Sequence, residues 1–158
     1  MFELKTNAFT DGSDIPVKYA NTVIAGGENV SVPLSWTGAP TGTKSFALVC
    51  VDRNPMADNW IHWLVINIPA DATSIPEGAS TTDRMPVGSV ELKNTFGNNK
   101  YQGPQPPQGT GPHEYEFILY ALNIERIDVA QEPTFGEFEA AVKPKLIEAA
   151  KISGEVER

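Results

Sequence analysis

The segment KSFALVCVDRNPMADNWIHWLVINI, residues 44–68, consists of two apolar runs joined by a short polar stretch. In both runs, residues 44–51 and 62–68, apolar side chains stand at successive positions and not only at alternate ones. A strand with this pattern is covered on both faces of its sheet. The segment therefore predicts two central strands, and any polar site must lie at their ends.

Residues 115–122 repeat this pattern. The rest of the first 125 residues forms short strand-like segments separated by Gly, Pro, Asn and Asp, with no helical apolar period of useful length. This arrangement is typical of an all-β sandwich or barrel. It indicates a single mainly β domain that spans residues 1–158.

The C-terminal part of the chain differs from the strand-rich part. Thr134 and Glu137 have the spacing of a capping box, which predicts that a helix begins there. Pro144 interrupts this helix and is suited to the first turn of a second helix, residues 145–151. One or two short C-terminal helices are therefore expected.

Charge and composition narrow the possible partners. The net charge is −8, which opposes attraction to nucleic acid and to anionic lipid surfaces. The first residues have neither a basic nor an apolar segment of signal-peptide length, and no apolar run approaches the roughly 20 residues of a membrane span. We expect a cytoplasmic protein without membrane insertion. The single cysteine, Cys50, is expected to be buried and functionally silent.

A first candidate site follows the strand predicted over residues 44–51. Asp52 leaves that strand and His62 enters the next, so a short connection places them within hydrogen-bonding distance of each other. Trp60 shares a face with His62, and its indole is suited to form a wall beside the imidazole. The sharp turn favours a cis Asn54-Pro55 bond. The alternative is a core histidine with a packing tryptophan.

A second candidate site follows a long segment, residues 94–112, rich in Gly, Pro, Asn and Gln. Loops of this length in compact domains are usually functional or disordered. His113 and Tyr115 come next and share a face at the mouth of a central strand. Imidazole N–H and phenol O–H groups both donate to an oxygen anion, and glycines allow backbone N–H groups to approach closely. The alternative is a Pro-rich surface turn with a half-exposed histidine.

Together these motifs resemble the phosphatidylethanolamine-binding protein family, in particular its bacterial and archaeal Raf-kinase-inhibitor-like branch. The resemblance covers nearly the whole chain. It is carried by Ile15-Pro16, Tyr19, 32–36, 42–45, 52–55, Trp60, His62-Trp63, 67–69, 94–97, Tyr101, Gly103-Pro104, Pro106-Pro107, Gly109, His113, Tyr115, Phe117 and 119–122.

The resemblance implies a large antiparallel β-sandwich or Greek-key fold with peripheral helices. It also implies a shallow pocket for phosphate, acetate or a phosphorylated head group, with no cofactor. The implied ligand-binding residues are Asp52, Trp60, His62, Gly103, Pro106, Pro107, His113 and Tyr115. Three positions depart from the family pattern: Asn54 replaces an acid, Gln105 a small residue and Glu114 an arginine. These departures bear on ligand preference.

In such a pocket Asp52 accepts a hydrogen bond from one histidine ring, fixing its tautomer and favouring its protonated form. The other ring nitrogen then faces the ligand, and affinity for anions falls as pH rises through the histidine range. The expected protein is a non-enzymatic binding module for a small anionic ligand or a phosphorylated partner, and the resemblance implies a homodimer. Alternatives are a metal-dependent hydrolase using both histidines and Asp52, and a protein scaffold that does not use the pocket.

Overall fold

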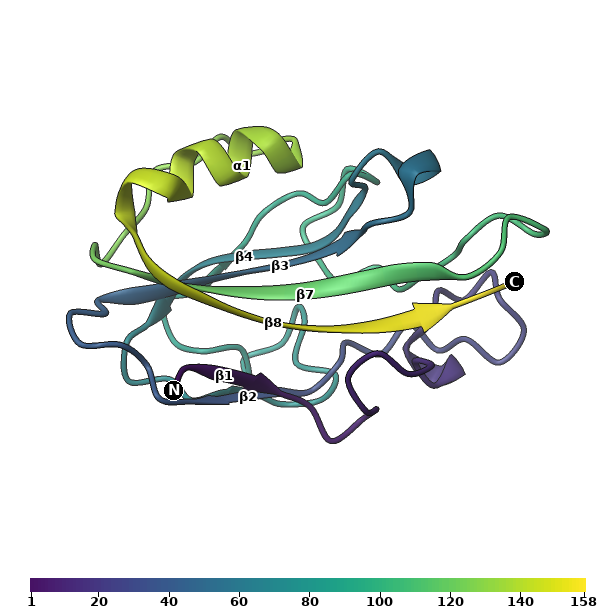
Figure 1. The fold of residues 1–158 in the computed structure, drawn as a ribbon, viewed down its shortest axis with the longest axis horizontal. Helices are drawn as coiled ribbons and strands as arrows, with labels where there is room; N and C mark the ends of the chain where they lie inside the picture. Colours follow the sequence, from purple (N-terminus) through teal and green to yellow (C-terminus); the bar gives the residue numbers. More distant parts are fainter.

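The larger sheet of the protein has five strands, all paired antiparallel, in the order β6-β4-β3-β7-β8 (Figure 1). The computed structural model describes residues 1–158. The three strands predicted to be central lie in the middle of this sheet, which confirms the prediction. The strands are β3 (Ser45–Asp52), β4 (Ile61–Pro69), β6 (Val90–Glu91), β7 (His113–Leu122) and β8 (Leu146–Val156).

A smaller antiparallel sheet and one helix cover the two faces of the larger sheet. Figure 1 shows β1 and β2 below the larger sheet and α1 above it. The expected mainly β, antiparallel architecture is therefore confirmed. The remaining elements are β1 (Glu3–Lys5), β2 (Leu34–Thr37), β5 (Ser74–Ile75), α1 (Phe135–Val142) and the 3₁₀ turns η1 (Val17–Tyr19), η2 (Pro55–Ala57) and η3 (Lys143–Lys145).

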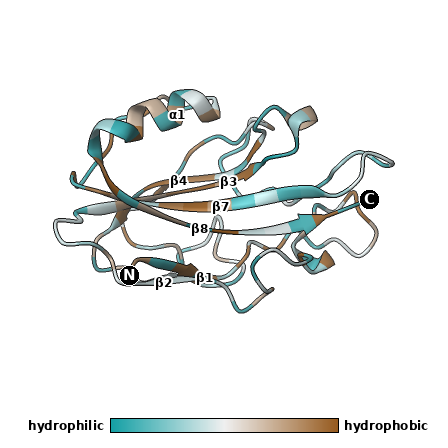
Figure 2. Ribbon diagram, viewed as in Figure 1, coloured by the Kyte–Doolittle hydropathy of each residue, from teal (hydrophilic) through white to brown (hydrophobic).

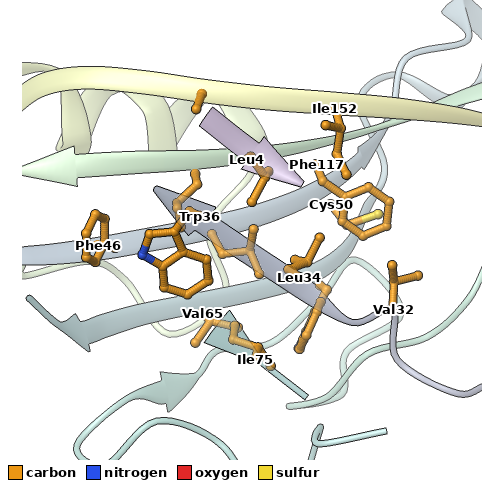
Figure 3. Packing of buried hydrophobic residues seen from close by; sticks show 14 of the residues in the cluster. Leu4, Val32, Leu34, Trp36, Phe46, Cys50, Val65, Ile75, Phe117 and Ile152 are labelled. Atoms are coloured by element: carbon orange, nitrogen blue, oxygen red, sulfur yellow. The ribbon is translucent and has the colours of Figure 1, made fainter. Parts of the chain in front are cut away.

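Alternate side chains of β3 enter two separate cores. Phe46, Leu48 and Cys50 pack in a cluster of 22 buried residues between the two sheets (Figure 3). Ala47 and Val49 pack in a second cluster of 14 buried residues, which includes side chains of α1. Figure 2 shows the resulting apolar colouring along the middle of the larger sheet. Cys50 is buried as expected, and burial raises the pKa of its thiol.

The capping box at the start of α1 forms as predicted. The Thr134 hydroxyl accepts from the Glu137 backbone N–H at 3.1 Å, and the Glu137 carboxylate accepts from the Thr134 N–H at 2.9 Å. No helix of the structure has the length and apolar character needed to cross a bilayer.

The predicted second helix over residues 145–151 is wrong. Pro144 lies in η3, and the chain then runs as β8 along the whole of β7. Pairing with β7 gives β8 a ladder of backbone hydrogen bonds and buries Ala150 and Ile152 in the core between the sheets. Tertiary pairing therefore overrides a local preference for helix.

The predicted cis Asn54-Pro55 bond is also wrong, since the chain contains no cis peptide bond. Pro55 instead begins η2, and the Asn54 side chain accepts from the Met56 N–H at 3.0 Å. Asp58 (φ 49°) and Asn59 (φ 55°) follow in the left-handed region, which Asp and Asn tolerate better than most residues. Two left-handed residues in succession reverse the chain without a cis proline.

Candidate functional site

The antiparallel arrangement of three strands places the candidate residues together. Because β3 runs antiparallel to both β4 and β7, its C-terminal end lies beside the N-terminal ends of both neighbours. Asp52 is in register with Tyr115, and Val51 with Ile61. This end of β7 is coloured as hydrophilic in Figure 2, in contrast to the apolar middle of the strand. Polar residues that lie far apart in sequence thus meet at one end of the sheet, where β3 ends and β4 and β7 begin.

A pocket of about 910 Å³ opens at this end of the sheet. Its walls come from the β3–β4 connection, from the segments around residues 94–96 and 105–107, from the start of β7 and from the start of α1. The structure brings seven of the eight predicted residues into the lining. These are Asp52, Trp60, His62, Pro106, Pro107, His113 and Tyr115.

Gly103, the eighth predicted residue, does not line the pocket. A Cβ atom at this position would lie 2.1 Å from the backbone oxygen of Tyr19. The Gly103 N–H donates to the Asn29 side chain at 2.6 Å. The glycine therefore allows the long loop to pack closely on the end of η1, and its backbone also lies beside the buried His62 ring.

Asp52 accepts from one histidine ring, as expected, but this ring is that of His113 and not that of His62, which the short β3–β4 connection favoured. His113 Nδ1–H donates to Asp52 Oδ2 at 2.7 Å, and the Asn54 backbone N–H donates to Oδ1 at 2.9 Å. Both residues of the pair are buried. The register explains the pairing: because Asp52 lies opposite Tyr115, the residue two positions earlier in β7 is its diagonal neighbour on the same face.

His62 is held by the main chain of the long loop. Its Nδ1–H donates to the Gln102 carbonyl oxygen at 2.7 Å. Burial lowers the pKa of His62 to about 4, against the smaller opposing effects of the Gln102 carbonyl and the Asp52 charge. The His62 ring is therefore neutral near pH 7, and it is not the protonated imidazole that the sequence led us to expect at this site.

The second ring nitrogen of His113 is occupied as well. His113 Nε2 lies 3.0 Å from the oxygen of the Thr110 hydroxyl, whose single proton is donated to the Pro107 carbonyl oxygen at 2.7 Å. The sequence predicted that the nitrogen not bound by Asp52 would face a ligand; in His113 it faces Thr110. Sequence reasoning did not find Thr110 or the Gln102 carbonyl, because neither position carries a residue type that signals such a role.

The Tyr115 hydroxyl is buried and has no hydrogen-bond partner in the protein. Burial, followed by the nearby Asp52 charge, raises the pKa of Tyr115 well above its ordinary value, so the hydroxyl keeps its proton. The Tyr115 ring contacts the His62 ring edge-on, with 5.1 Å between ring centroids, and stacks on His113 at 6.5 Å. Tyr115 thus places a free donor between the two histidines.

Aromatic side chains form one wall of the pocket. Phe96 makes edge-to-face contacts with both Trp60 and His62, each with 5.3 Å between ring centroids. Trp60 is 38% exposed, which places it at the mouth. The expected Trp60 wall is therefore completed by Phe96, which the sequence marked only as part of the motif at residues 94–97.

The charged lining residues are Asp52, Asp58 and Glu132, with no lysine or arginine among them. Of the three departures from the family pattern, Gln105 lines the pocket, Asn54 caps η2, and Glu114 is exposed outside the lining. The structure contains no group of three His, Cys, Asp or Glu side chains that could hold a metal ion. Both Asp52 oxygens and both His113 nitrogens are already engaged within the protein.

The fold and site define a class of protein: two antiparallel sheets, with a pocket at the end of the larger one where a buried Asp–His pair meets a second histidine and a tyrosine. The model of the phosphatidylethanolamine-binding protein family matches residues 5–157, and the chain belongs to this family.

Relatives in bacteria and archaea place the chain in the branch that the sequence motifs indicated. A UPF0098 protein of Methanothermobacter thermautotrophicus is 45% identical over 120 residues, which cover 76% of each chain. The UPF0098 protein YbhB of Escherichia coli is 40% identical over 130 residues, covering 80% of this chain and 82% of YbhB. The crystal structure of Escherichia coli YbcL superposes with a TM-score of 0.91 at 32% identity, covering 99% of this chain and 98% of YbcL.

Proposed function

We propose that this protein is a non-catalytic binding protein for a phosphate-type oxyanion, carried by a small molecule, a head group or a phosphorylated partner. The observation that carries the proposal is the Tyr115 hydroxyl, a protonated donor without a partner in the pocket lining. Leaving a buried donor unpaired costs about 1–3 kcal/mol, so an arriving ligand oxygen gains the bond that the protein does not provide.

The surrounding residues are suited to orient such a ligand. The Asp52–His113 pair holds the start of β7 in place, and the stacked His113 ring supports Tyr115. Phe96 and Trp60 give the mouth an apolar wall for the body of the ligand. Family membership supports the same function, because this family is named for binding a phosphate-containing lipid.

The test is calorimetric titration of inorganic phosphate into the wild type and the Tyr115→Phe variant. A hydrogen bond to a charged group contributes about 1.5–3 kcal/mol, so affinity should fall by roughly tenfold or more in the variant. Tyr120→Phe is the matched control, since Tyr120 lies on the same strand but donates to Glu139 on the α1 side. Equal phosphate affinity in all three proteins would contradict the proposal.

A further inference from the structure

The N-terminal segment covers only the second half of the outer edge of β8. β8 is the last strand of the larger sheet, so β7 pairs with one of its edges and the other edge faces outward. The Ser153 N–H donates to Asp11 Oδ1 at 2.8 Å, and the Ser153 carbonyl oxygen accepts from the Gly12 N–H at 2.8 Å. Two further backbone hydrogen bonds join Glu155 to residues 13–15. This cover ends at Ser153, and the first half of the edge has none.

Backbone groups in the uncovered half point outward. In an antiparallel pair, alternate residues direct their N–H and C=O groups toward the neighbouring strand, and the residues between them direct both groups away from it. Ser153 bonds outward, and the register with β7 is continuous from Glu148 to Val156, so Ala149 and Lys151 point outward as well. Both residues are exposed, and no segment beyond β7 makes a backbone hydrogen bond to either. Their N–H and C=O groups are therefore available to a further strand.

Apolar side chains lie beside these backbone groups. Leu146 is 38% exposed and Ile147 is 37% exposed, and Ala149 is exposed as well. Figure 1 shows this stretch where the chain leaves α1 and enters β8. Because β8 runs antiparallel to β7, it starts beside the end of β7, whereas the pocket lies at the start of β7. A strand that pairs here would bury exposed apolar surface far from the pocket.

The charge around this stretch is opposite in sign to that of the whole protein. Lys143 and Lys145 lie in η3 directly before β8, and Lys44 lies directly before β3. Leu122 of β7 is in register with the first residues of both β3 and β8, so the three lysines lie at one end of the sheet. All three are exposed, and none forms an ion pair. Glu148 is the one carboxylate among residues 143–151. On a protein of net charge −8, this local excess of lysine favours an acidic partner.

The devices that usually protect an edge strand do not block this one. Lysines and bulges commonly serve that purpose, and β8 contains both. The bulge lies at Ile147, before the residues whose backbone groups point outward. Lys151 pairs with Glu116 of β7 at 3.4 Å, so its side chain lies over the sheet and not across the edge. The bridge between Asp14 and Glu155 shows that an extended segment can pair with this edge.

We propose that residues 143–151 and Lys44 form a docking edge for an extended acidic segment of a partner protein, which pairs with β8 as a sixth strand of the larger sheet. The backbone groups of Ala149 and Lys151 supply the hydrogen bonds, and the exposed apolar side chains supply contact area. The lysines select acidic side chains. An anionic lipid surface makes no use of the backbone groups, and a second copy of this edge carries the same lysines.

The test uses three capped synthetic peptides of about seven residues, the length of a short strand. One alternates Val and Glu, one alternates Val and Gln, and the third repeats the Val–Glu sequence with N-methylated backbone amides. Each is titrated into the full chain and followed by NMR. We expect the Val–Glu peptide to bind at least roughly tenfold more tightly than the Val–Gln peptide, and the methylated peptide not to bind, since it has no backbone donors.

Amide hydrogen exchange locates the bound peptide. In the protein alone, the Ala149 and Lys151 amides should exchange fast, whereas those of Ala150 and Ile152, which face β7, should be protected. The Val–Glu peptide should slow exchange at Ala149 and Lys151. Bound peptide without this protection would place the peptide elsewhere and overturn the inference.

Two variants test the charge and the edge separately. Lys145→Glu replaces attraction by repulsion at an exposed position and should weaken binding of the Val–Glu peptide by roughly tenfold. Lys100→Glu is the matched control, an exposed lysine without an ion pair in the long loop, and should keep the wild-type affinity. Ala149→Pro removes an N–H that the sheet does not use, which edge strands tolerate, and should abolish binding.

Four results would overturn the inference. The first is no binding of the Val–Glu peptide, and the second is equal binding of the Val–Glu and Val–Gln peptides. The third is equal affinity of Lys145→Glu and Lys100→Glu. The fourth is an occupant of another kind: either a dimer in sedimentation that Ala149→Pro abolishes, or binding to phosphatidylglycerol vesicles that displaces the peptide. None of these results bears on phosphate binding in the pocket.

Discussion

The two histidines are both buried at the same end of the larger sheet, but different groups hold their imidazole rings. His113 has both ring nitrogens against side chains of the protein, Asp52 and Thr110. His62 lines the pocket and is held by the main chain of the long loop, where its Nδ1–H donates to the Gln102 carbonyl oxygen. The difference separates two roles that residue type alone does not distinguish: His113 anchors the start of β7, and His62 faces the pocket.

Removing the anchor of His113 should have the largest effect on stability. Asp52→Ala leaves the His113 Nδ1–H and the Asn54 N–H without their acceptor, and loss of one partner of a buried pair costs about 3–5 kcal/mol. Urea unfolding measures the loss. Cys50→Ala is the control: it should cost about 1 kcal/mol through lost packing and leave phosphate affinity unchanged. Equal losses in the two variants would show that Asp52 anchors nothing.

Asp52→Asn sharpens the same prediction. The amide still accepts from the Asn54 N–H, but its NH₂ group then meets the His113 Nδ1–H. Phosphate affinity should therefore fall through the lost orientation of β7, even though a negative charge leaves the pocket. Calorimetric titration decides the sign, since simple charge repulsion predicts tighter binding in Asp52→Asn.

His62 should make the protein sensitive to acid. Its pKa of about 4 in the folded protein lies below the ordinary 6.5, so the unfolded chain binds the proton first as pH falls. This effect of His62 on stability is absent above about pH 6.5. By pH 4, preferential proton binding by the unfolded chain lowers the free energy of unfolding by about 3 kcal/mol. Urea unfolding across this range should show a shallower pH dependence in His62→Gln. Parallel profiles would contradict the prediction.

Thr110→Val should have the smallest effect. The variant removes one hydrogen bond to His113 Nε2, which costs about 1 kcal/mol of stability. Phosphate affinity should stay within roughly twofold of the wild type, because His62 and Tyr115 keep their positions. A loss of affinity as large as that of Tyr115→Phe would assign His113 a direct part in binding and remove the distinction between the two histidines.

Sequence patterns predicted the parts of the fold that local physics controls. The segments that form β3, β4 and β7 are apolar on both faces, and both faces are buried only in the middle of a covered sheet. The Thr134–Glu137 capping box is complete within four residues. The segment after Pro144 was assigned incorrectly, because its strand exists only through pairing with β7. The turn after Asp52 was expected to need a cis proline, but two left-handed residues reverse the chain there.

The composition of the site followed from the sequence, whereas its internal connections did not. Seven of the eight residues inferred from motifs line the pocket. They lie together because the C-terminal end of β3 lies beside the N-terminal ends of its antiparallel neighbours, β4 and β7. Gly103 does not itself line the pocket, and a glycine that permits ligand approach and one that permits backbone packing look the same in a sequence.

By itself, the sequence determined the family, the central strands and the set of polar residues at their ends, since these depend on residue type, order and hydrophobic period. Only the tertiary structure decided that Asp52 pairs with His113, and that a carbonyl of the long loop fixes the His62 tautomer. The physical reason is that hydrogen bonds depend on register and on backbone atoms brought together from distant segments. Every residue carries the same carbonyl group, so residue identity cannot show which one His62 will meet.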